Sequence, residues 1–195
     1  MGIGKKTKNY LRPAIFIDRD GVLNDVVDRG EDFFVQGKKV RRTAPFRYDE
    51  FHLKSGVPET LEQIGNLGFL RILVTNQPDI AYGTMTPKEH ERIMADVKKL
   101  PLDDIFVCLH GRNDNCECKK PKPGMLLQAA KKWDIDLASS YIVGDGKGDM
   151  EAGRAAGCAT ILIKTDYNEG TEADMHIDNL AEILTVIKKQ NQLIE

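Results

Sequence analysis

Two aspartates separated by a single residue follow an apolar run near the start of the chain. The run Ala14-Ile-Phe-Ile leads into Asp18, Arg19, Asp20 and a glycine. Such a run is typical of a buried strand, and residues two apart on a strand point to the same face. Asp18 and Asp20 could therefore converge on one metal ion or substrate, although Asp-X-Asp-Gly is also an ordinary turn sequence.

Three more polar clusters follow in the same manner. An aliphatic run ends in Thr75, a rigid basic segment carries Lys119 and Lys120, and a third apolar run ends in Asp145 with Asp149 four residues further on. Open α/β sheets carry their chemistry at the carboxyl ends of the strands, so these groups could meet at one edge.

Each cluster also has an ordinary structural explanation when it is taken alone. Thr75 could be a β-branched strand residue, Lys120 could be one of 28 Lys and Arg residues at the surface, and Gly144-Asp145-Gly146 could be a turn. Only the order and spacing of the clusters, taken together, favour catalytic roles.

Cysteine and histidine form a second pattern, Cys-X-His followed by Cys-X-Cys. Its members are Cys108, His110, Cys116 and Cys118. Three thiolates and one imidazole make a closed tetrahedral set that suits structural Zn²⁺. A strained Cys116–Cys118 disulfide and free thiols in a reducing compartment are the alternatives. Cys158 is expected in a core, and His52, His90 and His176 have no motif context.

The four clusters, in their order, resemble the motifs of the haloacid dehalogenase (HAD) superfamily of aspartyl phosphotransferases from about residue 13 to residue 165. The runs Asp18-Arg-Asp-Gly-Val-Leu-Asn24, Thr75-Asn-Gln77 and Lys119-Lys-Pro-Lys-Pro-Gly-Met125, with the cysteine pairs, resemble more closely the subgroup of heptose-bisphosphate phosphatases and histidinol-phosphatase-like enzymes.

The resemblance implies a role for each motif residue. Asp18 would attack phosphorus, and Asp20 would protonate the leaving oxygen and then activate water. Mg²⁺ would be held by Asp18, the backbone carbonyl of Asp20 and Asp145, with Asp149 in support. Thr75, Asn76 and Lys120 would contact the phosphoryl oxygens. Further substrate contacts are assigned to Arg19, Gln77 and Lys119. The zinc set would order the segment that leads into Lys119 and Lys120.

A magnesium-dependent phosphatase acting on a sugar phosphate such as a heptose bisphosphate is the function that the resemblance implies. Histidinol phosphate or another small phosphomonoester is an alternative substrate, and a non-catalytic module that binds a phosphorylated ligand is an alternative function. The chain departs from the subgroup's usual pattern at Pro78-Asp79-Ile-Ala-Tyr82, where a cation is lost, at Gly146, where a lysine is common, and in a short spacing between His110 and Cys116. These departures bear on the substrate rather than on the reaction.

Apolar runs alternate with helical patterns along the chain. The runs cover 14–18, 70–75, 104–109, 140–144 and 159–164, and the helical patterns cover 57–67, 87–99, 124–133, 149–156 and 179–189. This alternation predicts a central parallel sheet covered on both faces, the Rossmann-like three-layer sandwich of the α/β class. By resemblance the fold is capless, with a zinc-binding loop and a short flap at 25–56. The basic residues of this segment could clamp a second phosphate, or the segment could be a solvated charged loop.

Composition agrees with one phosphatase domain over 13–195 after a flexible tail at 1–12. The formal net charge of −2 gives no general attraction to nucleic acid. No apolar stretch approaches the roughly 18 residues of a membrane span, and no secretory signal is recognisable. We therefore expect a cytoplasmic protein, a small phosphorylated substrate as its partner, and a monomer in preference to an oligomer.

Overall fold

A six-stranded sheet forms the centre of the protein. The computed structural model describes residues 11–192, with side chains to residue 189. The strand order is β10-β9-β8-β1-β6-β7, and every neighbouring pair is parallel. The strands are β1 (Ala14–Ile17), β6 (Leu70–Asn76), β7 (Asp104–Cys108), β8 (Tyr141–Gly144), β9 (Ala159–Ile163) and β10 (Met175–Ile177). The predicted parallel sheet is confirmed, and β10 is an addition to it.

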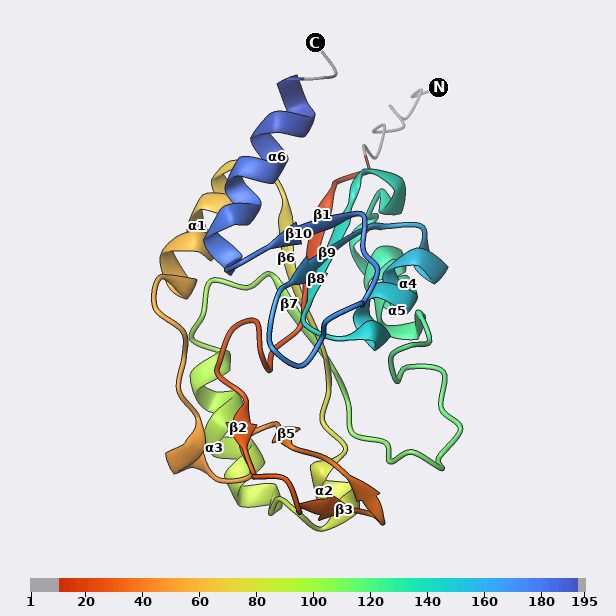
Figure 1. The fold of residues 1–195 in the computed structure, drawn as a ribbon. Coiled ribbons are helices and arrows are strands. Elements are labelled where there is room, and N and C mark those ends of the chain that lie inside the picture. Colours follow the sequence, from red (N-terminus) through yellow and green to blue (C-terminus); the bar gives the residue numbers. More distant parts are fainter. Residues whose placement is uncertain (1–10, 193–195) are drawn as a thin grey trace, which may run out of the picture.

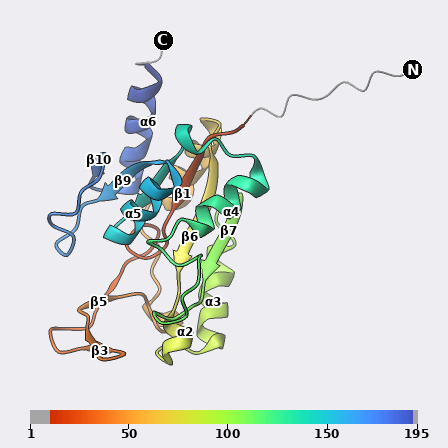
Figure 2. The same ribbon diagram turned by 90° about the vertical axis from the view of Figure 1, so that its right-hand side faces the viewer.

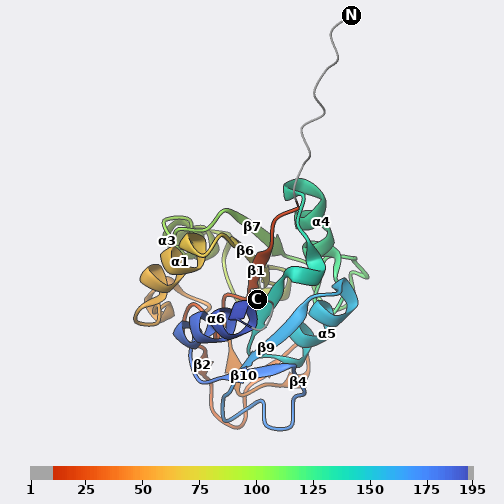
Figure 3. The ribbon, with the colours of Figure 1, turned by 90° about the horizontal axis from the view of Figure 1, so that it is seen from above.

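Helices cover both faces of this sheet (Figures 1 and 3). One layer contains α1 (Val57–Asn66), α3 (Pro87–Val97) and α6 (Ile183–Gln192), and the other contains α4 (Gly124–Trp133) and α5 (Lys147–Ala156). The sequence of β1 is apolar throughout because both faces of the strand are buried. Ile15 and Ile17 pack into one core, and Ala14 and Phe16 pack into the other. The expected three-layer sandwich is therefore confirmed.

The shorter elements lie mainly around the carboxyl ends of the strands. They are α2 (Asp79–Tyr82) and the 3₁₀ turns η1 (Tyr48–Glu50), η2 (Leu137–Ser139) and η3 (Leu180–Glu182). The flap, residues 25–56, adds two small antiparallel ladders, β2 (Val27–Asp28) with β5 (Arg42–Thr43), and β3 (Phe34–Val35) with β4 (Lys38–Lys39). It lies beside α2 and α3 at the lower end of the view (Figures 1 and 2), so a short flap takes the place of a cap domain.

Ion pairs within the flap engage most of its basic residues. Arg29 binds Glu50 at 2.7 Å, Arg41 binds Glu31 at 2.6 Å, and its guanidinium also reaches Asp28. The remaining pairs within the flap are Lys39–Asp32, Arg42–Asp28, Arg47–Asp49 and Arg47–Glu50, and Arg42 also binds Asp166 of the loop after β9. The basic cluster that the sequence offers as a phosphate clamp is thus largely neutralised by acidic partners.

Strand-like pairing begins at Arg12, whose backbone forms a bridge with Ile135. Residues 1–10 lie outside the described part of the chain, and so does most of the tail predicted at 1–12. Among residues 11–192, no helix is both long enough and apolar enough to cross a bilayer.

Candidate active site

The carboxyl ends of the central strands open into a cleft of about 450 Å³. Asp18 follows β1, Asn76 ends β6 and Asp145 follows β8, and all three line the cleft with Asp20 and Lys119. The walls are completed by residues of the flap, of α2 and of the loops after β7 and β9, namely Val26, Val35, Val40, Arg42, Thr43, Ala44, Pro78, Asp79, Tyr82, Arg112 and Tyr167. The structure therefore brings the predicted strand-end residues together.

Lys120 is a buried cation that contacts Asp18, one of the residues that line this cleft. Its ammonium nitrogen lies 2.9 Å from Oδ1 of Asp18 and also contacts the carboxylate of Asp149. Although burial alone would lower its pKa, the charges of Asp149 and Asp18 raise it above the usual value. The residue as a whole is 5% exposed. Lys120 therefore stays charged between two acids, where it can neutralise a phosphoryl group.

Asn76 fixes the backbone on which Lys120 is carried. Its Oδ1 accepts a hydrogen bond from the backbone N–H of Lys120 at 3.0 Å, and its Nδ2 donates to the carbonyl of the same residue at 3.0 Å. Both polar atoms of the amide are used in this pairing. The geometry thus favours a positioning task for Asn76 in addition to the phosphoryl contact that the sequence suggests.

Three carboxylates approach one another beside Lys120. One oxygen from each of Asp18, Asp145 and Asp149 lies within 4.8 Å of the others. Burial, opposed by Lys120 and reinforced by the neighbouring acids, raises the pKa of Asp18 to about 7. Burial and the charge of Asp149 raise the pKa of Asp145 to about 6. Acids held together against this repulsion suit a hard divalent cation such as Mg²⁺, which prefers oxygen ligands.

The carboxylate of Asp20 is turned toward a different set of partners. Its Oδ1 accepts hydrogen bonds from Arg19 and Asn24, at 2.8 Å and 3.0 Å, and its Oδ2 accepts from Nε2 of Gln77 at 2.7 Å. The carboxylate is therefore held apart from the Asp18–Asp145–Asp149 group while it still lines the cleft. Such a fixed orientation is what a proton donor and acceptor requires.

Arg19 and Gln77 serve this arrangement from inside the protein. Arg19 is fully buried, with its guanidinium on Asp20 and its Nη1 near the sulfur of Met94, and Gln77 is 1% exposed. Nε2 of Gln77 also donates to the hydroxyl oxygen of Thr75 at 2.9 Å. The geometry argues against direct substrate contact for Arg19 and Gln77, because neither side chain reaches the cleft. Thr75 is itself fully buried and accepts this hydrogen bond through its hydroxyl oxygen.

Asp149 lies in the first turn of α5, and its side chain accepts a hydrogen bond from the backbone of the N-cap residue. Its Oδ2 accepts the backbone N–H of Gly146 at 3.1 Å, and its Oδ1 contacts Lys120. A Cβ at Gly144 would lie 2.3 Å from Asp149, so the close approach of strand end and helix requires glycine there. With both oxygens engaged, Asp149 fits the predicted supporting role. Helix α5 begins two residues earlier than the sequence pattern indicates.

The cysteine set lies in the loop between β7 and α4, residues 109–123, together with the end of β7. Sγ of Cys108 is 3.7 Å from that of Cys116 and 3.2 Å from that of Cys118, and Nδ1 of His110 is 3.5 Å from Cys108 and 3.2 Å from Cys118. A tetrahedral ion with bonds of about 2.3 Å to sulfur separates its sulfur ligands by roughly 3.8 Å.

Ionisation of all three thiols at this position would require a bound cation. Burial and the adjacent Cys108 and Cys116 raise the pKa of Cys118 to about 12, so three thiolates would not coexist here without a positive charge. All three are free cysteines rather than disulfide partners. The geometry and the chemistry of the donor set are thus compatible with a structural zinc ion.

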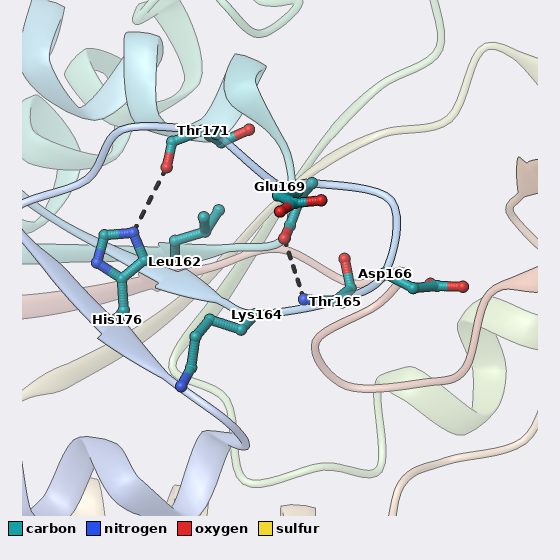
Figure 4. Close-up of a pocket in the computed structure, with 9 residues that line it drawn as sticks. Leu162, Lys164, Thr165, Asp166, Glu169, Thr171 and His176 are labelled. Carbon is teal, nitrogen blue, oxygen red and sulfur yellow. Dashed lines mark hydrogen bonds between the residues drawn. The ribbon is translucent and has the colours of Figure 1, made fainter.

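A second pocket, of about 310 Å³, lies under the loop between β9 and β10 (Figure 4). Lys164 and His176 line it with Thr171, but Lys164 is paired with Asp178 at 2.6 Å and His176 contacts the carbonyl of Thr171. It includes none of the strand-end carboxylates of the cleft. The candidate chemistry therefore belongs to the cleft.

Two residues near Asp145 escape the sequence analysis. The hydroxyl of Tyr167 donates to Oδ2 of Asp145 at 2.5 Å, and Nδ2 of Asn168 donates to the carbonyl oxygen of Asp145 at 2.9 Å. Both lie in the irregular segment Thr165-Asp-Tyr-Asn-Glu-Gly, where no periodicity or motif separates a functional side chain from a loop residue. Only the folded chain shows their proximity to the site.

A parallel sheet with Asp18 and Asp20 after β1, a threonine near the end of β6 and acids after β8 defines a HAD-like hydrolase. In agreement, residues 117–186 match the family model described as HAD-hydrolase-like. The chain belongs to the D-glycero-β-D-manno-heptose-1,7-bisphosphate 7-phosphatase family of this superfamily. It is 35% identical to the Escherichia coli K12 enzyme of that name over 199 residues, which cover 92% of this chain and 96% of the relative.

Other relatives agree with this assignment. The Helicobacter pylori enzyme of the same name is 34% identical over 183 residues, covering 90% of this chain and 97% of the relative. Among solved structures, the D,D-heptose 1,7-bisphosphate phosphatase from B. bronchiseptica, complexed with magnesium and phosphate, superposes with a TM-score of 0.72 and 28% identity. That match covers 91% of this chain and 99% of the solved one.

Proposed function

We propose that this protein is a magnesium-dependent phosphatase that removes the 7-phosphate of D-glycero-β-D-manno-heptose 1,7-bisphosphate. The observation that carries the proposal is Asp18, which lines the cleft with its carboxylate 2.9 Å from the buried ammonium of Lys120. A nucleophile beside a fixed positive charge is what phosphoryl transfer needs. The identity of the substrate is inferred from the relatives, whose names state that activity.

Two displacements on one phosphorus atom make up the proposed reaction. Asp18 attacks phosphorus to form an aspartyl-phosphate, while Asp20 gives a proton to the departing sugar oxygen. Asp20 then takes a proton from water, which attacks the aspartyl-phosphate and releases inorganic phosphate. Lys120 and the hydroxyl of Thr75 stabilise the charge on the transferring oxygens. The hydrogen bonds from Arg19, Asn24 and Gln77 hold Asp20 ready for both proton transfers.

Two metals complete the proposal. Mg²⁺ would be held by Asp18, Asp145 and the backbone carbonyl of Asp20, and would supply charge neutralisation and orientation for the phosphoryl group. Zn²⁺ would be held by Cys108, His110, Cys116 and Cys118 as a structural ion. Because thiolate ligands persist in a reducing compartment, we propose the cytoplasm as the location.

The second phosphate of the substrate would contact Lys119 and Arg112 rather than the flap. Both line the cleft, and both also line an adjoining pocket with Lys122 and Asn115. Nζ of Lys119 donates to the carbonyl of His110 at 3.0 Å and lies 6.0 Å from the ring of Tyr82, at the cleft wall. Most of the flap cations, by contrast, are paired with acids.

Phosphate release across a substrate panel tests the proposal. We expect the 1,7-bisphosphate to be hydrolysed with the highest kcat/KM, followed by the 7-phosphate, and we expect Lys119→Ala to raise KM about tenfold for the bisphosphate but little for the 7-phosphate. Histidinol phosphate is the second candidate, because the buried carboxylate of Asp79 at the cleft wall would favour an ammonium group. A preference for histidinol phosphate would overturn the sugar assignment while keeping the reaction.

Magnesium should stabilise the protein more at pH 8 than at pH 5.5. The folded state raises the pKa of Asp145 to about 6 and that of Asp18 to about 7, so it binds more protons than the unfolded chain between about pH 4 and pH 7. Without magnesium, the free energy of unfolding therefore falls as pH rises through that window. A cation replaces the lost protons and restores stability at high pH.

Thermal melting at the two pH values, with and without Mg²⁺ and without chelator so that zinc stays bound, checks this expectation. The matched variant is Asp145→Asn, which removes one raised pKa. It should melt above the wild type in magnesium-free buffer at pH 8 and gain little from the metal. An equal magnesium shift at both pH values would contradict the linkage.

Removing one thiol of the cysteine set should cost zinc and activity together. Cys108 pairs with Asn76 in the sheet, and Asn76 holds the backbone of Lys120, which lies two residues after Cys118. We expect mass spectrometry to find one zinc ion per protein in the wild type and none in Cys118→Ser. We expect kcat/KM of this variant to be lower by about tenfold or more. Cys158→Ala, outside the set in the α5-side core, should retain zinc. Full activity without zinc would refute the link.

A further inference from the structure

Asp145 is held in place by the loop that follows β9, residues 164–174. Oδ2 of its carboxylate accepts a hydrogen bond from the hydroxyl of Tyr167 at 2.5 Å. Its backbone carbonyl accepts a hydrogen bond from Nδ2 of Asn168 at 2.9 Å. Side chain and backbone of one acid are thus bound by two consecutive residues of a distant segment. This double attachment sets both the position and the rotation of the carboxylate.

The loop itself is fastened by the same asparagine. Nδ2 of Asn168 also donates to the carbonyl of Ile163 at 2.7 Å, and its Oδ1 accepts the backbone N–H of Thr165 at 3.0 Å. Asn168 is 8% exposed. Because its amide closes the loop on the end of β9, Tyr167 is presented to Asp145 from a fixed backbone.

The backbone at Gly21 also lies against this carboxylate. This glycine has φ +79°, and a Cβ at its position would lie 1.9 Å from Oδ2 of Asp145 and 3.0 Å from the hydroxyl of Tyr167. The oxygen of Asp145 that accepts the hydrogen bond from Tyr167 is therefore also in close contact with the backbone at Gly21. Fixing one oxygen of a carboxylate fixes the direction of the other.

A flap residue holds the tyrosine from outside. Arg42 on β5 binds the carboxylate of Asp166 at 2.8 Å, and its guanidinium lies 5.9 Å from the centre of the Tyr167 ring. Figure 4 shows the side chain of Asp166, which belongs to the lining of the pocket under the loop, extending away from Leu162, Thr171 and His176. The loop is thereby clamped between the flap and Asp145.

We propose that Tyr167 is a positioning residue for the metal site, which orients the carboxylate of Asp145 for Mg²⁺ through its hydroxyl group. The inference rests on the magnesium site of the proposed function. Hydrogen bonds to a metal-binding carboxylate fix its orientation before the ion arrives, and their loss weakens metal affinity more than it weakens folding.

Magnesium titration of Tyr167→Phe tests this inference without any substrate. The variant keeps the ring and its contact with Arg42 and removes only the hydroxyl. We expect the dissociation constant of Mg²⁺, measured by calorimetry on the zinc-loaded protein, to rise about tenfold with the metal-free melting temperature nearly unchanged. The control is Tyr141→Phe, whose partly buried ring packs against Phe69 in the core and which should bind Mg²⁺ as the wild type does.

A magnesium affinity in Tyr167→Phe equal to that of the wild type would overturn the inference. An equal loss of magnesium affinity in Tyr141→Phe would also overturn it, because such a loss would reflect general loosening of the fold. Failure of the proposed function would give a different set of results. If the wild type binds Mg²⁺ but does not hydrolyse the heptose bisphosphate, the substrate assignment fails, while a tenfold weaker affinity in Tyr167→Phe still supports the positioning role. A wild type that binds no Mg²⁺ would overturn both.

Discussion

Asp18→Asn should abolish turnover while leaving the protein folded. The substitution replaces the proposed nucleophile by an amide of the same shape, and removal of a covalent nucleophile costs at least about 10⁴-fold in kcat. Stability should not fall, because burial already disfavours the charged form of Asp18, whose pKa is raised to about 7, and because Lys120 keeps Asp149 as a partner. Steady-state phosphate release and thermal melting measure the two effects.

The same variant separates an enzyme from a module that only binds a phosphorylated ligand. A binding module would keep its ligand affinity in Asp18→Asn and would show no turnover in the wild type. The matched variant Asp20→Asn should lower kcat by about 10² to 10⁴-fold, since it removes the proton donor and the activator of water. Mass spectrometry of wild type and Asp20→Asn mixed rapidly with substrate should find phosphate on Asp18. Turnover by Asp18→Asn near that of the wild type would exclude the aspartyl-phosphate route.

The sequence predicts the central sheet well because its strands are buried on both faces. In β1 every residue packs into one of the two cores, so the apolar run is continuous and its end at Asp18 is sharp. Strand β10 is missed for the opposite reason, because its three residues include the exposed His176. The flap ladders, of two residues in each strand, are too short to leave a periodic pattern.

Within the site, the sequence predicts the positions of the acids. It does not predict which groups the side chains of adjacent residues, such as Arg19 and Asn76, contact. Whether Arg19 faces substrate or turns inward to Asp20 depends on the space behind β1, and the structure turns it inward with no exposed surface. The pairing of Asn76 with the backbone of Lys120 joins residues that are 44 positions apart. Such contacts follow from tertiary packing, which spacing along one chain does not specify.

The flap shows the same limit for charge. Its basic residues look like an anion site in the sequence, but residues such as Arg41 and Arg47 are paired with acids of the flap itself. A count of lysines and arginines gives the charge of a segment, whereas the acids in contact decide which cation remains for a ligand. Lys119 and Arg112, from the loop between β7 and α4, therefore become the better candidates for the second phosphate.

Lys120→Met should lose both stability and activity, because the lysine neutralises two buried acids. Removing it leaves the carboxylates of Asp18 and Asp149 facing each other with no cation between them, and breaking a buried pair in this way costs about 3 to 5 kcal/mol. The loss should be larger at pH 8 than at pH 5.5, since Asp18, whose pKa is already raised, takes up a proton at the lower pH. Loss of one charge stabiliser of the transition state lowers kcat by about 10² to 10³-fold.

Chemical denaturation at both pH values and phosphate release measure these losses, with Lys122→Met as the control for stability. Lys122 is an exposed lysine of the same segment whose partner, Glu117, is at the surface, so its loss should change the free energy of unfolding by less than about 0.5 kcal/mol. The double variant Lys120→Met with Asp149→Asn should recover much of the stability, because one of the two unpaired charges is gone, without recovering turnover. Recovery of turnover in that double variant would show that Lys120 acts on the fold alone and has no part in stabilising the phosphoryl group.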